Sequence, residues 1–317
     1  MDHILDNTLE PPLIQFNGHL QTIVPSVFRK VDGINYQRER IDTPDNDFLD
    51  LDWSLRGSSK LVILSHGLEG SSDRGYIMGM VAQFDQLGWD SLAWNYRGCS
   101  GEINRQLRFY HSGATDDLDC VIQHAVSSGR YQEICLLGFS LGGNLTLKYL
   151  GEQPSLPAPL SRAIVFSVPL DLHHSCLKLM QGFSKVYSYR FLRKLKRKVR
   201  AKAELYPGIF DLKKMEGINR LIDFDDAFTG PVHGFKSAVD YYESCSAQKF
   251  MYDIEIPTLI VNARNDPFLS EQCYPQQKLK HHPYVQLLIP GLGGHVGFRT
   301  KSGHYKSEEL AVQFLQQ

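Results

Sequence analysis

The chain has 317 residues, of which 42% are hydrophobic and 22% are charged, and its formal net charge is −1. These values are ordinary for a globular protein and give no sign of nucleic-acid binding, which a strongly basic chain would show. No stretch approaches the roughly 20 apolar residues of a membrane span. The chain starts with Met1 to Asp6, which carry acids and lack an apolar core, so we expect no signal peptide and a cytoplasmic location.

The six cysteines are spread along the chain without a C-x-x-C pair. We interpret them as reduced structural thiols, because neither a disulfide framework nor zinc-site spacing is present. They are Cys99, Cys120, Cys135, Cys176, Cys245 and Cys273. The acidic run from Asp223 to Asp226 is expected to cap a helix or to pair with basic neighbours. The sequence therefore predicts no metal and no cofactor.

Residues 1–30 are rich in turn-forming residues, so we expect an irregular arm that wraps on the core and carries His19 and Gln21. Residues 34–42 and 48–55 are expected to form an antiparallel hairpin at the edge of a sheet. Apolar and polar side chains alternate along the second segment, and turn-forming residues separate the two.

From residue 60 onward, short apolar runs alternate with helical patterns. The runs that we predict to be strands are 60–65, 91–96, 133–137, 163–168, 258–262 and 285–289. The helices predicted among them are 76–87, 115–128, 144–150, 236–250 and 307–314. Strands that alternate with helices indicate the α/β class, with a mostly parallel, twisted sheet flanked by helices.

One long interval breaks this alternation. After the strand predicted at 163–168, a long stretch shows helical patterns only, including a basic one from Lys185 to Lys202. We therefore predict a helical cap segment, residues 173–235, inserted into a core formed by residues 1–172 and 236–317.

The sequence Gly138-Phe139-Ser140-Leu141-Gly142 joins a predicted strand to a predicted helix. In this setting G-x-S-x-G is typical of a nucleophile elbow, a strained turn that projects the serine hydroxyl above the sheet edge. Glycines flank the serine because side chains there would collide with the neighbouring strand or helix. We predict that Ser140 is a nucleophile. The alternative is a glycine-rich turn that binds nothing.

A nucleophilic serine needs an adjacent base, which a third group orients. In an elbow protein the partners follow in the order Ser, acid, His, on loops after later strands. Asp266 and His295 follow the last two predicted strands, the histidine in a glycine-rich loop. We predict that both act with Ser140. Asp171, at the end of an earlier strand, is the alternative acid.

The oxyanion that forms during attack needs two backbone N–H donors. One should be the N–H of Leu141, directly after the nucleophile, where the N-terminus of the new helix points at the site. The other should come from the loop after the strand at 60–65, where His66-Gly67 precedes Leu68. An ordinary strand-end turn is the alternative for that loop.

These motifs resemble the α/β-hydrolase superfamily. Within it the chain resembles the YheT-like group of hydrolases, relatives of the eukaryotic abhydrolase-domain phospholipases and of the yeast medium-chain ethyl ester synthases. The likeness is carried by residues 16–22, 66–70, 95–101, 110–113, 138–144, 224–226, 234–235, 240–242, 265–267 and 293–295. The resemblance implies an α/β-hydrolase fold and a charge relay of Ser140, Asp266 and His295. It also argues against treating residues 16–22 as a mere arm.

We therefore predict a serine carboxylesterase that hydrolyses short- to medium-chain acyl esters through an acyl-enzyme. An acyltransferase that uses an alcohol instead of water is one alternative, and a lipase or phospholipase-like enzyme is another. A non-catalytic binding protein on the same fold is a third, against which the intact triad argues. The expected partner is a small acyl ester, without nucleic acid.

The basic stretch from Lys185 to Lys202 also carries apolar residues at helical spacing, such as Leu192, Leu195 and Val199. One hypothesis is that this helix contacts anionic lipid surfaces or substrates with acidic head groups. The alternative is a helix that packs its apolar stripe on the core and leaves its cations in solvent.

Overall fold

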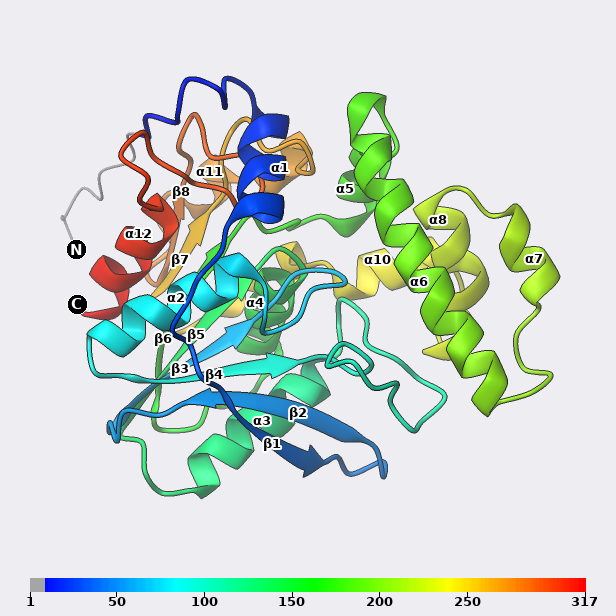
Figure 1. Cartoon of the computed structure of the whole chain (residues 1–317), viewed down its shortest axis with the longest axis horizontal. Coiled ribbons are helices and arrows are strands. Elements are labelled where there is room, and N and C mark those ends of the chain that lie inside the picture. Colours follow the sequence, from blue (N-terminus) through cyan, green and yellow to red (C-terminus); the bar gives the residue numbers. More distant parts are fainter. Residues whose placement is uncertain (1–8) are drawn as a thin grey trace.

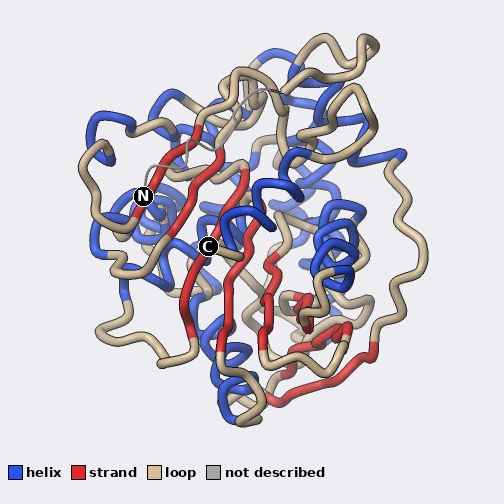
Figure 2. Tube along the Cα trace, turned by 90° about the vertical axis from the view of Figure 1, so that its left-hand side faces the viewer, coloured by secondary structure: helices blue, strands red, loops and turns tan. Residues whose placement is uncertain are grey.

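The computed structural model describes residues 9–317. Eight strands form one sheet in the order β1-β2-β4-β3-β5-β6-β7-β8. Their bounds are β1 (Gln37–Asp42), β2 (Phe48–Ser54), β3 (Lys60–Ser65), β4 (Asp90–Asn95), β5 (Glu133–Phe139), β6 (Leu160–Phe166), β7 (Thr258–Val261) and β8 (Val285–Leu288). β1 and β2 pair antiparallel at one edge, and the strands from β3 to β8 are parallel. Figure 2 shows how the strand direction turns progressively across the sheet, as its twist requires.

Helices cover both faces of this sheet. The α-helices of residues 9–317 are α1 (Gly18–Phe28), α2 (Gly75–Gln86), α3 (Thr115–Ser127), α4 (Leu141–Glu152), α5 (Leu172–Leu179), α6 (Lys185–Leu205), α7 (Leu212–Gly217), α8 (Leu221–Phe224), α9 (Gly230–Val232), α10 (Ala238–Cys245), α11 (Gln276–Leu279) and α12 (Lys306–Leu315). Leu61 and Ile63 of β3 pack with residues of α3 and α4, while Val62 and Leu64 pack with residues of α2 and α12. Alternate side chains of a strand point to opposite faces, so a strand buried on both sides is apolar throughout. The predicted α/β class and edge hairpin are confirmed.

The N-terminal segment differs from the prediction. Residues 18–28 form helix α1 instead of an irregular arm. Asn17 caps this helix by accepting a hydrogen bond from the N–H of Leu20 at 2.9 Å, and Pro25 lies inside it. The same residue types indicate a turn when the sequence is read alone, because Asn serves both as a turn residue and as an N-cap. Residues 1–6, from which we expected no signal peptide, lie outside the described residues.

The helices α5 to α9 come between β6 and β7 and stand beside the sheet (Figure 1). They build a hydrophobic cluster of their own, which includes Leu192, Val199 and Phe224 and also takes in Phe268 from the core. This arrangement fits the predicted cap segment, whose bounds at 173 and 235 remain a prediction. Within residues 9–317, no helix has both the length and the apolar composition needed to cross a membrane.

Three lysines of α6 face the core rather than solvent. Lys194 donates a hydrogen bond to the carbonyl oxygen of Glu69 at 2.8 Å, and Lys198 pairs with the carboxylate of the same residue at 2.8 Å. Lys202 is fully buried and donates to the carbonyl oxygen of Asn104 at 2.6 Å. Spacings of four residues place the three ammonium groups on one side of the helix. Part of the positive charge of α6 therefore anchors the helix to the core. Neither hypothesis drawn from the sequence includes this role.

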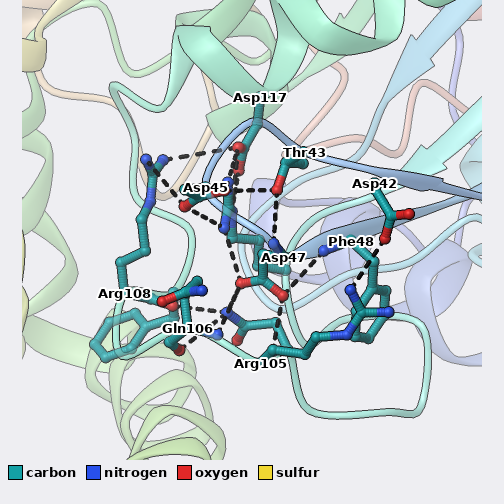
Figure 3. Close-up of polar contacts among 12 residues, drawn as sticks. Asp42, Thr43, Asp45, Asp47, Phe48, Arg105, Gln106, Arg108 and Asp117 are labelled. Carbon is teal, nitrogen blue, oxygen red and sulfur yellow. Dashed lines mark hydrogen bonds and ion pairs between the residues drawn. The ribbon is translucent and has the colours of Figure 1, made fainter.

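A buried charge network fixes the edge hairpin near this helix. The guanidinium of Arg97 contacts Asp45, Asp47 and Asp117 at 2.7–2.9 Å, and its side chain is 1% exposed. Figure 3 shows these three carboxylates converging from the hairpin turn and from α3. Asp47 also accepts a hydrogen bond from the backbone N–H of Arg105 at 2.7 Å. The network thereby joins the hairpin to the loop that receives α6.

We expect Arg97→Met to lower the free energy of unfolding by about 3–5 kcal/mol, because it leaves buried carboxylates without a counterion. Chemical denaturation with urea measures this loss. Arg105→Met is the control, since Arg105 pairs with Asp42 where both side chains are more than half exposed. It should cost at most about 1 kcal/mol. Equal small losses in the two variants would show that the Arg97 network contributes little.

Candidate active site

Ser140 lies on a strained turn between β5 and α4. Its backbone angles are φ 54° and ψ −117°, a conformation that residues with a side chain rarely adopt. The surroundings hold it there, because its N–H donates to the carbonyl oxygen of Phe166 at 2.8 Å. A Cβ on Gly138 would lie 2.5 Å from the carbonyl oxygen of Gly142, and one on Gly142 would lie 2.3 Å from that of Ser65. Both flanking glycines are therefore sterically required, as the elbow motif predicts.

Three predicted site residues come together at the carboxyl edge of the sheet. Nε2 of His295 lies 2.9 Å from Oγ of Ser140, and Nδ1 of His295 lies 2.8 Å from Oδ2 of Asp266. The histidine and the aspartate are 5% and 4% exposed. The carboxylate can only accept, so Nδ1 carries the proton and Nε2 is free to accept from the serine hydroxyl. This is the hydrogen-bond chain by which a serine is activated as a nucleophile.

Further contacts hold Asp266 and the imidazole of His295 in place. Oδ1 of Asp266 accepts a hydrogen bond from the N–H of Phe268 at 2.8 Å. The ring of Phe268 stacks on the ring of His295, with centroids 3.9 Å apart and an angle of 21° between the planes. Tyr187 of α6 packs on Phe268 in turn, at 4.7 Å between centroids. The cap segment therefore helps to orient the imidazole.

Helix α1 supports the loops that carry the acid and the base. Oγ1 of Thr22 accepts a hydrogen bond from the N–H of His295 at 2.8 Å. Oε1 of Gln21 accepts from the N–H of Gly293 at 2.8 Å and from Nδ2 of Asn265 at 2.9 Å. From the sequence we predict only that Gln21 lies in an arm, and we predict no role for Thr22. The only sequence signal for this role was the family likeness of residues 16–22.

The loop after β3 lies against Ser140. A Cβ on Gly67 would lie 3.3 Å from Cβ of Ser140. Two tyrosines fix the loop, since the hydroxyl of Tyr76 accepts from the N–H of Gly67 and that of Tyr110 accepts from the N–H of Glu69, both at 2.9 Å. Between them, the N–H of Leu68 has no hydrogen-bond partner within residues 9–317. An unpaired N–H beside a nucleophile can bind an anionic oxygen.

His66 is a support of this loop and not a second base. Burial lowers the pKa of its imidazole to about 3, so the ring is neutral at physiological pH. Nδ1 lies 2.8 Å from the carbonyl oxygen of Gly67, and Nε2 accepts from the N–H of Tyr96 at 3.4 Å. The hydroxyl of Tyr96 donates to the carbonyl oxygen of His66 at 2.5 Å. These bonds leave neither ring nitrogen free for a substrate.

Two cavities meet at Ser140, with volumes of about 150 and 110 Å³. The larger, which we call the polar cavity, is walled by α1, the loop at 67–76 and α6. The smaller, which we call the apolar cavity, is walled by the cap segment together with the loop at 109–112 and α10. Its apolar lining includes Phe109, Leu172, Leu179, Leu195 and Leu221. Both cavities are lined by Leu68, Ser140, Phe191, Phe268 and His295. An extended substrate could thus lie with one part on each side of Ser140.

Asp171, the alternative acid, is engaged elsewhere. It is the N-cap of α5, where it accepts from the N–H of His174 at 2.8 Å, and its other oxygen lies 2.9 Å from Nδ1 of the same histidine. Its carboxylate therefore serves a helix end. Asp266 is the acid that the structure brings to His295.

The acidic run in the cap segment also has local partners. Burial raises the pKa of Asp225 to about 6, and its carboxylate accepts from the hydroxyls of Thr229 and Tyr242. Asp226 accepts from the N–H of Ala238 at 3.0 Å. All six cysteines are free. Cys99 lies 2.9 Å from Nζ of Lys198, and burial raises the pKa of its thiol.

Comparison with known proteins identifies the family to which the chain belongs. Residues 57–281 match the family described as "Serine aminopeptidase, S33". The chain is 36% identical over 289 residues to YheT of Escherichia coli (strain K12), described as a candidate esterase, with 89% of this chain and 84% of that protein covered. It is 28% identical over 309 residues to the phospholipase ABHD3 of Mus musculus, with 94% of this chain and 75% of that protein covered.

A solved structure shares the fold. The esterase Pf2001 of Pyrococcus furiosus superposes with a TM-score of 0.59 and 18% sequence identity, over 91% of this chain and 97% of that one. At this identity the likeness concerns the fold alone. Together with the family match over residues 57–281 and the relationship to YheT, it shows that the chain belongs to the α/β-hydrolase superfamily.

Proposed function

We propose that this protein is a serine carboxylesterase that hydrolyses short- to medium-chain acyl esters through an acyl-enzyme. The observation that carries the proposal is the hydrogen-bonded chain from Asp266 through His295 to Ser140, at a point where two cavities meet. The descriptions of YheT as a candidate esterase and of ABHD3 as a phospholipase point to the same chemistry. No cofactor takes part.

The first half of the reaction forms the acyl-enzyme. Nε2 of His295 accepts the proton of the Ser140 hydroxyl while Oγ attacks the acyl carbon. Asp266 keeps the proton on Nδ1 and stabilises the imidazolium. The N–H groups of Leu68 and Leu141 bind the oxyanion, the second because it opens α4, where an N–H has no partner within the helix. The intermediate then collapses, the ester C–O bond breaks, and Nε2–H protonates the leaving alcohol.

The second half releases the acid. Water takes the place of the alcohol, and Nε2 of His295 accepts one of its protons as the water oxygen attacks the acyl carbon. Collapse of the second intermediate breaks the bond to Oγ of Ser140 and returns the proton to it. The acyl group leaves as a carboxylic acid.

The apolar cavity is the natural place for the acyl chain, because its lining is mainly aliphatic and aromatic. Its volume of about 110 Å³ favours short and medium chains over long ones. In a panel of p-nitrophenyl esters, we expect kcat/KM to peak between butyrate and octanoate and to be about 10-fold lower for palmitate. That factor corresponds to the loss of roughly 1.4 kcal/mol of transition-state binding. A palmitate ester that is hydrolysed best would contradict the size argument.

An acyltransferase would use the same three residues with an alcohol in place of water. Product analysis in the presence of ethanol separates the two reactions. We expect free acid to be the main product from an octanoyl ester. Predominant formation of ethyl octanoate would assign the protein to acyl transfer instead.

Contact of α6 with anionic lipid also remains a proposal, now with a defined surface. The outward-facing residues of the helix combine cations with two exposed apolar side chains, Val186 and Tyr189. The exposed cations of the helix that line neither cavity are Lys185, Arg193, Arg197 and Arg200. Each basic residue near an anionic membrane contributes about 1 kcal/mol of binding, which salt weakens. Lys194 and Lys198, which anchor the helix, do not belong to this surface.

We expect the protein to pellet with anionic vesicles at low salt, less at high salt, and little with neutral vesicles. The double variant Arg197→Glu/Arg200→Glu should lose about 4 kcal/mol of this attraction, from four units of charge at ~1 kcal/mol each. The matching double variant Arg197→Lys/Arg200→Lys keeps the charge and should pellet like the wild type. Equal pelleting with anionic and neutral vesicles would contradict the proposal.

A further inference from the structure

The polar cavity gathers positive charge next to the nucleophile. Its lining includes four cations, namely Arg29, Arg74, Arg190 and Lys194. Glu69 is the one acid among its lining residues. By contrast, the apolar cavity on the other side of Ser140 contains no lysine or arginine in its lining. The two sides of the candidate active site therefore differ sharply in charge.

The acid in the polar cavity does not neutralise these cations. The carboxylate of Glu69 already pairs with Lys198 at 2.8 Å and accepts the hydroxyl of Tyr110 at 2.7 Å. Within residues 9–317, Arg29 is the only one of the four cations that pairs with a buried carboxylate, that of Glu308. Three positive charges thus remain without a buried carboxylate.

Each of these three is held in a way that leaves its charge available. Nζ of Lys194 donates to a backbone carbonyl oxygen, that of Glu69, at 2.8 Å. Arg74 has Asp73 as its carboxylate partner, at 3.9 Å, and the side chain of Asp73 is 76% exposed. The side chain of Arg190 has no hydrogen bond or ion pair within the described residues 9–317. A distant, exposed carboxylate contributes little in water.

The three cations also face a common volume. Burial and then the positive charge of Arg74 are the main causes that lower the pKa of Lys194, and Arg190 adds to the effect. Arg74 is the N-cap residue of α2, whose first residues, Gly75 and Tyr76, line the same cavity. The N-terminus of this helix adds a partial positive charge at that point. Such a gathering of like charges is unfavourable unless an anion enters it.

We propose that the polar cavity binds an anionic group, best a phosphate, on the leaving alcohol of the ester. The inference rests on the proposed function, because it is Ser140 that divides the substrate into an acyl part and an alcohol part. With the acyl chain in the apolar cavity, the alcohol extends past Ser140 toward Arg74, Arg190 and Lys194. Two N–H groups of an arginine guanidinium can donate to two oxygens of one phosphate, and the ammonium group of Lys194 supplies a further donor.

The test compares two soluble esters with the same acyl chain, 1-octanoylglycerol and 1-octanoylglycerol 3-phosphate, both below the concentration at which they aggregate. We expect kcat/KM to be at least about 10-fold higher for the phosphorylated ester, the scale of one charge-assisted hydrogen bond. The preference should shrink as salt increases. In Arg190→Gln and Arg74→Gln, the ratio of the two kcat/KM values should fall several-fold toward one.

Arg193→Gln is the matched control. It removes the same charge from the same helix, but Arg193 does not line either cavity. Its substrate ratio should equal that of the wild type. An equal fall of the ratio in Arg193→Gln and Arg190→Gln would mean that general electrostatic attraction, and not this cavity, causes the preference.

The remaining outcomes separate this inference from the proposed function. Hydrolysis of both esters with equal kcat/KM overturns the anion site and leaves the esterase in place. Hydrolysis of neither ester overturns both. Inorganic phosphate should raise the KM of the phosphorylated ester. If it instead accelerates hydrolysis of the neutral ester and no preference exists, the cavity binds free phosphate and the assignment to the leaving group is wrong.

Discussion

Ser140→Ala should lower ester turnover by at least ~10³-fold, because no neighbouring side chain can form the acyl-enzyme in place of the serine. The substitution removes only the hydroxyl of Ser140. The backbone at φ 54° and the glycines on either side hold this hydroxyl in position. Alanine fits the same backbone without new contacts. The loss should therefore appear in kcat while the free energy of unfolding stays within about 1 kcal/mol of the wild-type value.

The control for this variant is Ser167→Ala. Ser167 also has a positive φ, 55°, and lies at the end of β6, where its hydroxyl accepts from the N–H of Val296 at 3.1 Å. Within residues 9–317, no hydrogen bond joins its hydroxyl to that of Ser140. Its effect on turnover should be much smaller. If Ser140→Ala kept turnover within about 10-fold of the wild type, Ser140 would not be the nucleophile.

Asp266→Asn should reduce kcat by about 10⁴-fold, the size of effect seen when the acid of a triad becomes an amide. The physical reason lies in the tautomer of His295. The oxygen of the new amide can still accept from the N–H of Phe268, so the amide nitrogen takes the place of Oδ2 and faces Nδ1. Nδ1 must then be the acceptor, and the proton moves to Nε2, which can no longer take the proton of Ser140.

Asp171→Asn is the matched control for the acid. Asp171 caps α5 and contacts His174, so its change should cost at most about 1 kcal/mol of stability and little activity. Steady-state kinetics on a p-nitrophenyl ester with both variants tests the assignment. A larger loss in Asp171→Asn than in Asp266→Asn would reverse the roles of the two acids.

The strands and the elbow could be predicted because their sequence signals are local. A strand buried on both faces is a short apolar run, as in residues 60–65 and 133–137, and no helix pattern competes with it. Ser140, Asp266 and His295 follow the ends of β5, β7 and β8, which lie at the same edge because these strands are parallel. Chain order and strand ends were thus enough to select residues that lie far apart in sequence and within hydrogen-bond distance in the structure.

The supports of the site could not be predicted in the same way. Gln21 and Thr22 act by bonding to loops more than 240 residues away, and nothing in their local pattern reports such contacts. Helix α1 was missed because Gly18 and Pro25, which lie inside it, are typical turn residues. The role of the α6 lysines could not be predicted for the same reason. Sequence spacing shows which residues share one face of a helix, but it does not show what that face contacts. Only the structure distinguishes Lys194 and Lys198 from the exposed arginines beside them.

The most direct test of the central claim is to locate the residue that a fluorophosphonate modifies in the wild-type protein. The probe reacts with activated serines, so mass spectrometry of a proteolytic digest should find one phosphonyl group, on the peptide that contains Ser140. Prior incubation with an octanoyl ester should slow the labelling. An unlabelled protein that still hydrolyses esters, or a label on any residue other than Ser140, would contradict the claim that Ser140 forms the acyl-enzyme.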